Sequence, residues 1–381
     1  MLLDRSLRLK SLPEYPFARI DRLKKEAKVD IIDLGIGDPD LPTPEYIISA
    51  LKNAIDNPIT HQYPPYSGYS SLRCEIASWY KKRFDVDLNP DKEILPLLGS
   101  KEGIAHILFS IINPCDYVLT PDPGYPVYKS ATILSGGIPR IVPLLSKNGF
   151  LPDLDNIDPN GCKAFFLNYP NNPTGATCSL DFLKDLVHFA RKNNIIILFD
   201  LAYSEVYFDE KPPSLLQIDG GMDVGIEFHS FSKTYNMAGW RLGFCVGNRD
   251  IIKSLLDLKT NLDSGIFGAI QYAGISALKN EGFVDEMRKV YKRRLDILTD
   301  GLSSCGFKVD MPKATFYLWA SIKGPSLDFS EKLLKDTGVV ATPGIGFGKY
   351  GEGFIRFSVA SPDERIKEAV SRIKKWHSFQ Q

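Results

Sequence analysis

The 381-residue sequence has little that would assign it to a specialised class of protein. Its 46 basic and 46 acidic residues cancel, so no charge surplus favours a nucleic acid or an anionic membrane as a partner. No apolar run approaches the ~20 residues that span a bilayer. The first residues, Met1 to Arg5, lack the apolar stretch of a secretory signal, and we therefore expect a cytoplasmic protein.

Cysteine and histidine are also scarce. The six cysteines are scattered without a C-x-x-C pair, and none of the five histidines stands at metal-ligand spacing from them. This pattern argues against a zinc site and against a disulfide scaffold. We expect no bound metal, and we expect the thiols to be reduced and mostly buried.

What is present is an alternation of short apolar runs with helical stretches. The alternation predicts βαβ units, hence an α/β fold with a mostly parallel central sheet. The runs are continuously apolar, as expected for strands that helices cover on both faces. The predicted strands are Ile94–Leu98, Tyr117–Thr120, Ile138–Pro143, Ala164–Asn168, Ile195–Asp200, Gly225–Ser230 and Leu242–Val246.

The two ends of the chain lack this regular alternation of strands and helices. A helix is predicted over Asp285–Leu302, and beyond it strands at Phe316–Ala320 and Phe354–Val359 mix with helices. We expect a smaller α+β domain there. The predicted division is an N-terminal arm with part of the small domain at 1–45, a large domain at 46–280, and a C-terminal small domain at 281–381.

The segment from Ser230 to Gly243 is the most informative for chemistry. A strand ends there in Ser230 and Ser232, Lys233 follows, and Arg241 stands eight positions further on. A pyridoxal-phosphate (PLP) enzyme needs an amine to form an imine, and it needs hydroxyls with a cation to hold a phosphate. The S-x-S-K tetrapeptide alone is weak evidence, but the whole segment is far more specific.

Three further segments place polar residues directly after strands. Asp200 ends a buried strand with Tyr203 three residues later, and a buried Asp suits a protonated pyridine nitrogen, although a helix N-cap is the alternative. Asn172 lies in a turn rich in Pro and Gly, where it could donate to a ring oxygen. Ser100 and Lys101 open a helix, whose N-terminal N–H groups favour an anion; an ordinary turn is the alternative there.

Together these segments resemble the class I/II PLP-dependent aminotransferases of fold type I, over nearly the whole chain. The resemblance implies a large domain that binds PLP, a smaller α+β domain and a homodimer with shared active sites. It implies Lys233 as the catalytic residue and the imine-forming amine, and Asp200 as the partner of the pyridine nitrogen. The other residues implied to bind the cofactor are Ser100, Lys101, Tyr125, Asn172, Tyr203, Ser230, Ser232, Arg241 and, from the partner subunit, Tyr63.

The resemblance also implies a substrate site. Arg356 matches the arginine that clamps the α-carboxylate, which suits a bidentate guanidinium, although a single Arg in a strand is more often half of a surface pair. Gly37 matches a loop that closes over the substrate. The remaining residues implied to contact substrate are Tyr15, Lys101 and Asn172.

Within that family, several strings are similar to bacterial LL-diaminopimelate aminotransferases, including Gly99–His106 and Leu12–Ala18. This implies LL-diaminopimelate and 2-oxoglutarate as substrates and a role in lysine and peptidoglycan precursor synthesis. Tyr66-Ser67 departs from the acidic residue that plant-like members carry at this stretch, so aspartate or alanine remain alternative amino donors.

Other classes of function remain open at this level. A PLP-dependent C–S lyase could carry the same motifs, because a fold does not fix a reaction. A non-catalytic regulator of the same fold is the alternative from another class, but the sequence offers no basic segment for a DNA-binding module. Gly344–Gly348 is rich in glycine but lacks the G-x-G-x-x-G spacing of a dinucleotide site.

Overall fold

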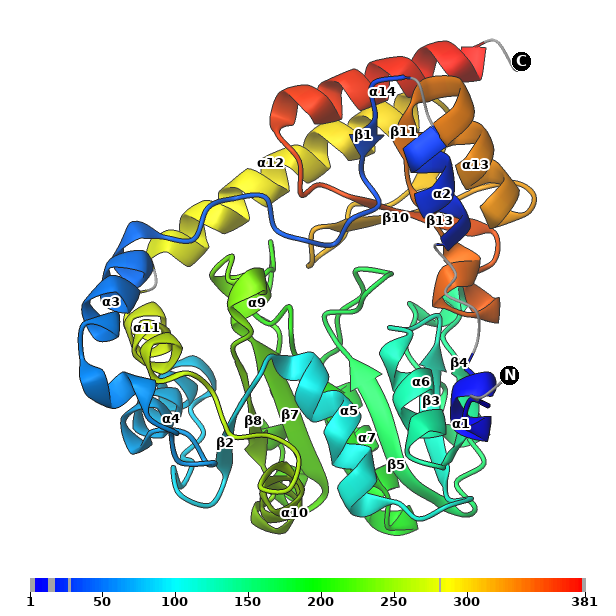
Figure 1. The fold of residues 1–381 in the computed structure, drawn as a ribbon. Helices are drawn as coiled ribbons and strands as arrows, with labels where there is room; N and C mark the ends of the chain where they lie inside the picture. Colours follow the sequence, from blue (N-terminus) through cyan, green and yellow to red (C-terminus); the bar gives the residue numbers. More distant parts are fainter. Residues whose placement is uncertain (1–3, 13–17, 27–28, 281, 379–381) are drawn as a thin grey trace.

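The computed structural model describes residues 4–12, 18–26, 29–280 and 282–378. In Figure 1 a large sheet with its helices occupies the lower part of the molecule, and a smaller domain sits above it. The long helix α12 (Gly282–Ser304) runs along the top and joins the two. Within the described ranges, no helix is both long enough and apolar enough to cross a membrane.

The large sheet has seven strands in the order β2-β8-β7-β6-β5-β3-β4. Only β8 runs antiparallel to its neighbours, so the predicted, mostly parallel α/β sheet is confirmed. Each predicted strand is present within a few residues. The bounds are β2 (Ile94–Leu97), β3 (Tyr117–Asp122), β4 (Ile138–Pro143), β5 (Cys162–Asn168), β6 (Ile196–Asp200), β7 (Gly225–Ser230) and β8 (Gly243–Gly247).

The central strands of this sheet are buried on both faces, whereas the edge strand β4 is partly exposed. Along β5, Phe166 packs into a cluster with α5 (Ser100–Ile111), α6 (Val127–Leu134) and α10 (Arg249–Lys259), whereas Phe165 packs against α7 (Leu180–Asn193) on the opposite face. Successive side chains of a strand point to opposite faces, so a strand between two helix layers must be apolar at every position. This burial explains the continuous apolar runs of the sequence.

The smaller domain has a four-stranded antiparallel sheet in the order β12-β13-β10-β9. A parallel pair joins β1 to β11, so a segment near the N-terminus is built into the same domain as the C-terminal third of the chain. The bounds are β1 (Ile32–Asp33), β9 (Lys308–Val309), β10 (Tyr317–Ser321), β11 (Val339–Val340), β12 (Thr342–Pro343) and β13 (Phe354–Ser358), with helices α13 (Ser326–Thr337) and α14 (Asp363–Ser378).

The N-terminal helix α2 (Ala18–Glu26) packs against the small domain. In this helix, Ile20 is buried against Leu334 and Val340 of the small domain. The domain boundaries at 45 and 280 remain a prediction.

The remaining helices are α1 (Leu7–Lys10), α3 (Glu45–Ile55), α4 (Ser70–Phe84), α8 (Gly221–Val224), α9 (Phe231–Thr234) and α11 (Gly268–Leu278), with 3-10 turns at Pro58–His61, Ser146–Asn148, Leu154–Asn156, Leu215–Gln217, Ala238–Trp240, Gly344–Phe347 and Lys349–Gly351.

Candidate active site

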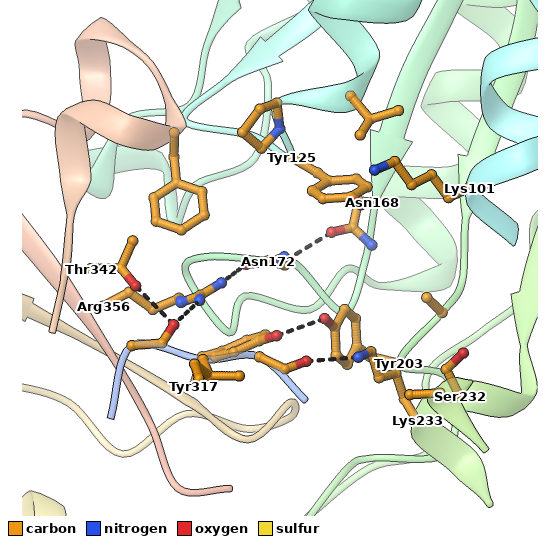
Figure 2. A pocket seen from close by; sticks show the side chains of 18 of the residues that line it. Lys101, Tyr125, Asn168, Asn172, Tyr203, Ser232, Lys233, Tyr317, Thr342 and Arg356 are labelled. Carbon is orange, nitrogen blue, oxygen red and sulfur yellow. Dashed lines mark hydrogen bonds between the residues drawn. The ribbon is translucent and has the colours of Figure 1, made fainter. Parts of the chain in front are cut away.

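A cavity of about 800 Å³ lies beside the carboxyl ends of β5, β6 and β7, between the large sheet and the small domain. Ligands of open α/β sheets bind at this edge, because the loops that follow the strands converge there. Figure 2 shows the side chains that point into the cavity. The predicted site residues that line it are Gly37, Ser100, Lys101, Tyr125, Asn172, Asp200, Tyr203, Ser230, Ser232, Lys233, Arg241 and Arg356.

Lys233 lies in α9, a single turn that follows β7. Ser230 caps this turn, since its side-chain oxygen accepts a hydrogen bond of 3.2 Å from the backbone N–H of Ser232. The Nζ atom of Lys233 donates to the carbonyl oxygen of Gly37 at 2.7 Å. Burial lowers the pKa of Lys233 to about 8; Asp38 opposes this effect, while Arg356 and Arg241 add to it. A buried amine of this kind is partly neutral near physiological pH and can act as a nucleophile or base.

Asp200 is the buried anion of the site. Its carboxylate accepts hydrogen bonds from the hydroxyl of Tyr128 at 2.7 Å and from the backbone N–H of Ala202 at 3.1 Å. Burial raises the pKa of Asp200 to about 6, and these two donors oppose the rise. Asn168, at the end of the neighbouring strand, donates to the backbone oxygen of Asp200 at 2.8 Å. The carboxylate is therefore fixed in position and suited to a buried cationic partner.

Arg356 projects from β13 into the opposite wall of the cavity. Its guanidinium donates to Asn172 Oδ1 and to the carbonyl oxygen of Gly35, both at 2.7 Å, and the Thr342 hydroxyl shares the Gly35 carbonyl at 2.9 Å (Figure 2). The group lies 4.1 Å above the ring of Tyr317. Arg356 is therefore not half of a surface ion pair; it is a buried cation that faces the cavity.

Ser100, Ser230, Ser232 and Arg241 bring hydroxyls and a cation to the end of the cavity beside α5. Arg241 has a left-handed backbone (φ 55°), and its guanidinium donates to the carbonyl oxygen of Ala238 at 2.8 Å. Gly99 has a left-handed backbone (φ 85°) that favours glycine, and a Cβ there would displace that guanidinium from its present position. Helix α5 begins at the same place, and the free N–H groups of a helix N-terminus favour an anion.

One of the predicted residues that the structure describes does not line this cavity. The side chain of Tyr63 is 88% exposed and does not line it, so its predicted role in the site of a partner subunit stays a prediction. Tyr15 lies outside the described residues.

The structure adds polar residues that the sequence analysis did not assign. Asn168 and Tyr128 hold Asp200, and Tyr317 bonds the hydroxyl of Tyr203 at 2.9 Å. Asn168 could have been found, because it ends a predicted strand next to the Asn172 turn. Tyr128 and Tyr317 could not, because an aromatic residue in a helix or strand has the same pattern whether it packs or bonds a site residue.

A second ionic cluster lies behind the start of α5. Glu102, His106 and Asp263 come close enough to share a cation. The Lys259 ammonium, only 1% exposed, already supplies a positive charge: it donates to Glu102 at 2.9 Å and to Asp263 at 2.8 Å. His106 Nδ1 lies 2.7 Å from the same Glu102 oxygen that Lys259 contacts. The cluster joins the start of α5 to the end of α10.

Residues 29–373 match the family model described as "Aminotransferase class I and II", so the chain belongs to this family. Its chemistry is the transfer of an amino group, and the chain is a transaminase.

Individual relatives are similar over almost their whole length. The chain is 52% identical to an LL-diaminopimelate aminotransferase of Syntrophobacter fumaroxidans, with 97% of each chain covered. It is also 52% identical to the protein of that name from Aquifex aeolicus, with 96% of this chain and 97% of the relative covered. Among solved structures, substrate-bound BacF from Bacillus subtilis superposes with a TM-score of 0.95 at 40% identity, covering 99% and 98% of the two chains.

Proposed function

We propose that this aminotransferase binds pyridoxal phosphate and exchanges the amino group of LL-diaminopimelate with 2-oxoglutarate. The observation that carries the cofactor assignment is the partly buried Lys233 amine, whose desolvation lowers its pKa to about 8, in one cavity with the buried Asp200 carboxylate. The substrate assignment is supported by relatives at about 50% identity that bear this name.

The donor set of the cavity fits the cofactor. An aldehyde requires an amine, supplied by Lys233, and a pyridine nitrogen requires a fixed anion, supplied by Asp200. Ser100, Ser230, Ser232 and Arg241 would hold the phosphate, with Lys101 nearby. Asn172 and Tyr203 would donate to the ring oxygen, and Tyr125 would stack on the ring. When bound, the cofactor acts as an electron sink for a carbanion at the substrate Cα.

The protein's own residues account for binding and proton transfer. Arg356 would bind the substrate α-carboxylate, and its Nε atom is buried without a hydrogen-bond partner in the described part of the chain, so it has a donor to spare. Once released from the cofactor, the Lys233 amine would remove the proton from Cα and later return one. Gly37 and its loop would cover the amine, since its carbonyl oxygen already accepts from Nζ.

We also propose a homodimer in which Tyr63 enters the partner's site. Tyr63 stands among other exposed apolar and aromatic side chains on the surface formed by the 3-10 turn Pro58–His61, helix α11 and the turns beside them. These side chains include Ile59, Tyr66, Leu262, Phe267 and Tyr272. Exposed apolar side chains gathered in this way are typical of a protein interface. Gly265 packs against Pro64, so the two segments that carry these residues are in contact.

An absorption titration of the purified enzyme tests the function. The bound cofactor should give a visible band that LL-diaminopimelate or glutamate abolishes, as the amino group passes to the cofactor. A response to aspartate or alanine alone would retain the aminotransferase but discard the diaminopimelate assignment. Release of pyruvate and ammonia without a keto-acid acceptor would indicate a lyase. In Lys233→Ala the half-reaction should be abolished with the fold retained, and wild-type turnover by this variant would contradict the role of Lys233.

A further inference from the structure

Tyr317 lies at the first position of β10, where it contacts both functional walls of the cavity. Its hydroxyl is 2.9 Å from the hydroxyl of Tyr203, and the two rings meet nearly edge to face at a centroid distance of 5.6 Å. Tyr317 is 1% exposed and Tyr203 is 5% exposed. Water therefore cannot easily replace this hydrogen bond. Which of the two hydroxyls donates depends on their other hydrogen-bond partners.

The direction follows from counting protons. Each phenol carries a single proton, and neither hydroxyl has another hydrogen-bond partner among the side chains and backbone that the structure describes. If Tyr203 gives its proton to an oxygen in the cavity, its own oxygen can accept only from Tyr317. A hydroxyl that accepts one hydrogen bond becomes a stronger donor in the next, because the bonds of a chain polarise one another.

Tyr317 is also fixed from two other sides. The guanidinium carbon of Arg356 lies 4.1 Å from the centre of its ring. Gly37 passes so close to the Tyr317 hydroxyl that a Cβ at this glycine would collide with it. The phenol is therefore held between the loop that contacts Lys233 and the arginine that faces the substrate position.

We propose that Tyr317 is a positioning residue that donates a hydrogen bond to the Tyr203 hydroxyl. This hydrogen bond orients the Tyr203 hydroxyl toward an oxyanion in the cavity, and Tyr317 thereby connects Tyr203 to Arg356. The inference rests on the proposed function, in which the oxyanion is the cofactor's ring oxygen. Tyr317 itself touches neither cofactor nor substrate in this assignment. It acts through Tyr203, so its removal should change a property of the ring oxygen and not the capacity to bind cofactor.

The charges around this pair come from several elements. Burial raises the pKa of Tyr317. The positive charge of Arg356 on β13 and the hydrogen bond with Tyr203 oppose the rise, and Asp38 in the Gly37 loop adds to it. Tyr203 additionally faces Asp200 at the end of β6. Tyr291 on α12 also faces Tyr317, and Lys233 contacts the Gly37 loop from α9.

The test is Tyr317→Phe, which removes the hydroxyl and keeps the ring beneath Arg356. In the loaded enzyme, donors to the ring oxygen stabilise its negative charge and thereby lower the pKa of the neighbouring Lys233 nitrogen. Loss of the Tyr317 donor should raise that pKa by ~0.5 to 1 pH unit, followed by visible absorption against pH. A titration that coincides with wild type would overturn the proposal.

Two further variants separate positioning from general disturbance. Tyr291→Phe is the matched control, because this buried hydroxyl has no hydrogen-bond partner in the described part of the chain and its ring packs on Phe316, next to Tyr317. It should titrate as wild type. Combining Tyr317→Phe with Tyr203→Phe should add nothing to the shift of Tyr203→Phe alone, since one acts through the other. Additive shifts would overturn the proposal, whereas a wild-type enzyme without any visible band would instead refute the proposed function.

Discussion

At the residue scale, burial decides the chemistry of the two principal ionisable groups. Removal from water disfavours the charged form of each, so the pKa of Lys233 falls to about 8 and that of Asp200 rises to about 6. The neighbouring groups favour a different protonation state in each case. Asp200 receives two hydrogen bonds that favour its anion, whereas the arginines near Lys233 favour its neutral form. The cavity thus holds a carboxylate and a partly neutral amine at neutral pH.

The lowered pKa of Lys233 predicts its reactivity in cofactor-free protein. As pH rises, the free amine should appear with a midpoint near pH 8, and at pH 7 its free fraction should exceed that of an ordinary lysine by roughly two- to three-hundredfold. Pulse labelling with a small amine-reactive reagent, read by mass spectrometry, measures this midpoint.

Lys184 is the internal control for this labelling. It is exposed, and its hydrogen bond to Asp181 raises its pKa above 10.5. The variant Asp38→Asn should move the Lys233 midpoint further down, because it removes the carboxylate that opposes the shift. Labelling of Lys233 with the same midpoint as Lys184 would contradict the assignment.

At the element scale, a buried ionic cluster holds the anion site together. Lys259, in the last turn of α10, bonds the Glu102 carboxylate in the first turn of α5, and Glu102 in turn accepts from the backbone N–H of Leu98 at 3.1 Å. The strand β2, the turn at Gly99 and the start of α5 are thereby connected to α10. The position of Ser100 and of the helix N-terminus depends on this connection.

Lys259→Met should therefore destabilise the protein strongly. The substitution keeps most of the side-chain length but leaves Glu102 and Asp263 without their shared cation, and breaking a buried pair in this way costs about 3 kcal/mol of unfolding free energy. Denaturant unfolding measures the loss. Lys253→Met on the same helix removes an exposed ion pair with Asp257 and should cost far less. Equal losses in the two variants would show that the cluster has no special role.

At the scale of the whole molecule, the site is assembled from both domains. Lys233 and Asp200 come from the ends of strands of the large sheet, whereas Arg356 and Tyr317 come from β13 and β10 of the antiparallel sheet above it (Figure 1). Any change in the distance between the sheets would separate Arg356 from Asn172, which it now contacts at 2.7 Å. The proposed dimer adds Tyr63 as a third source of site residues.

Mixed dimers test that proposal. Tyr63→Phe alone should weaken cofactor binding by about tenfold or more, the worth of a hydrogen bond to a charged group. In a co-expressed mixture of Tyr63→Phe and Lys233→Ala chains, about half of the sites that contain Lys233 should regain wild-type affinity, because their partner supplies an intact Tyr63. The visible band reports only the sites that contain Lys233, because the band requires the bond between Lys233 and the cofactor. If no site regains affinity, Tyr63 acts within its own chain or not at all.

The sequence by itself determined the fold class and most of the site. Apolar runs bounded by turn residues located the strands of the large sheet, because burial on both faces favours apolar side chains along its central strands. Lys233, Asp200 and Asn172 could be located because each follows a strand end, and parallel strands bring their carboxyl ends to one edge.

Only the tertiary structure decided which residues support that site. Tyr128, Tyr317 and Lys259 lie within a helix, a strand and a helix end, where their types are equally expected for packing or for surface. Their partners are 72, 114 and 157 positions away in the chain, namely Asp200, Tyr203 and Glu102. A local pattern records which face of an element is buried, but not which distant hydroxyl or carboxylate it meets, since that depends on how the elements pack.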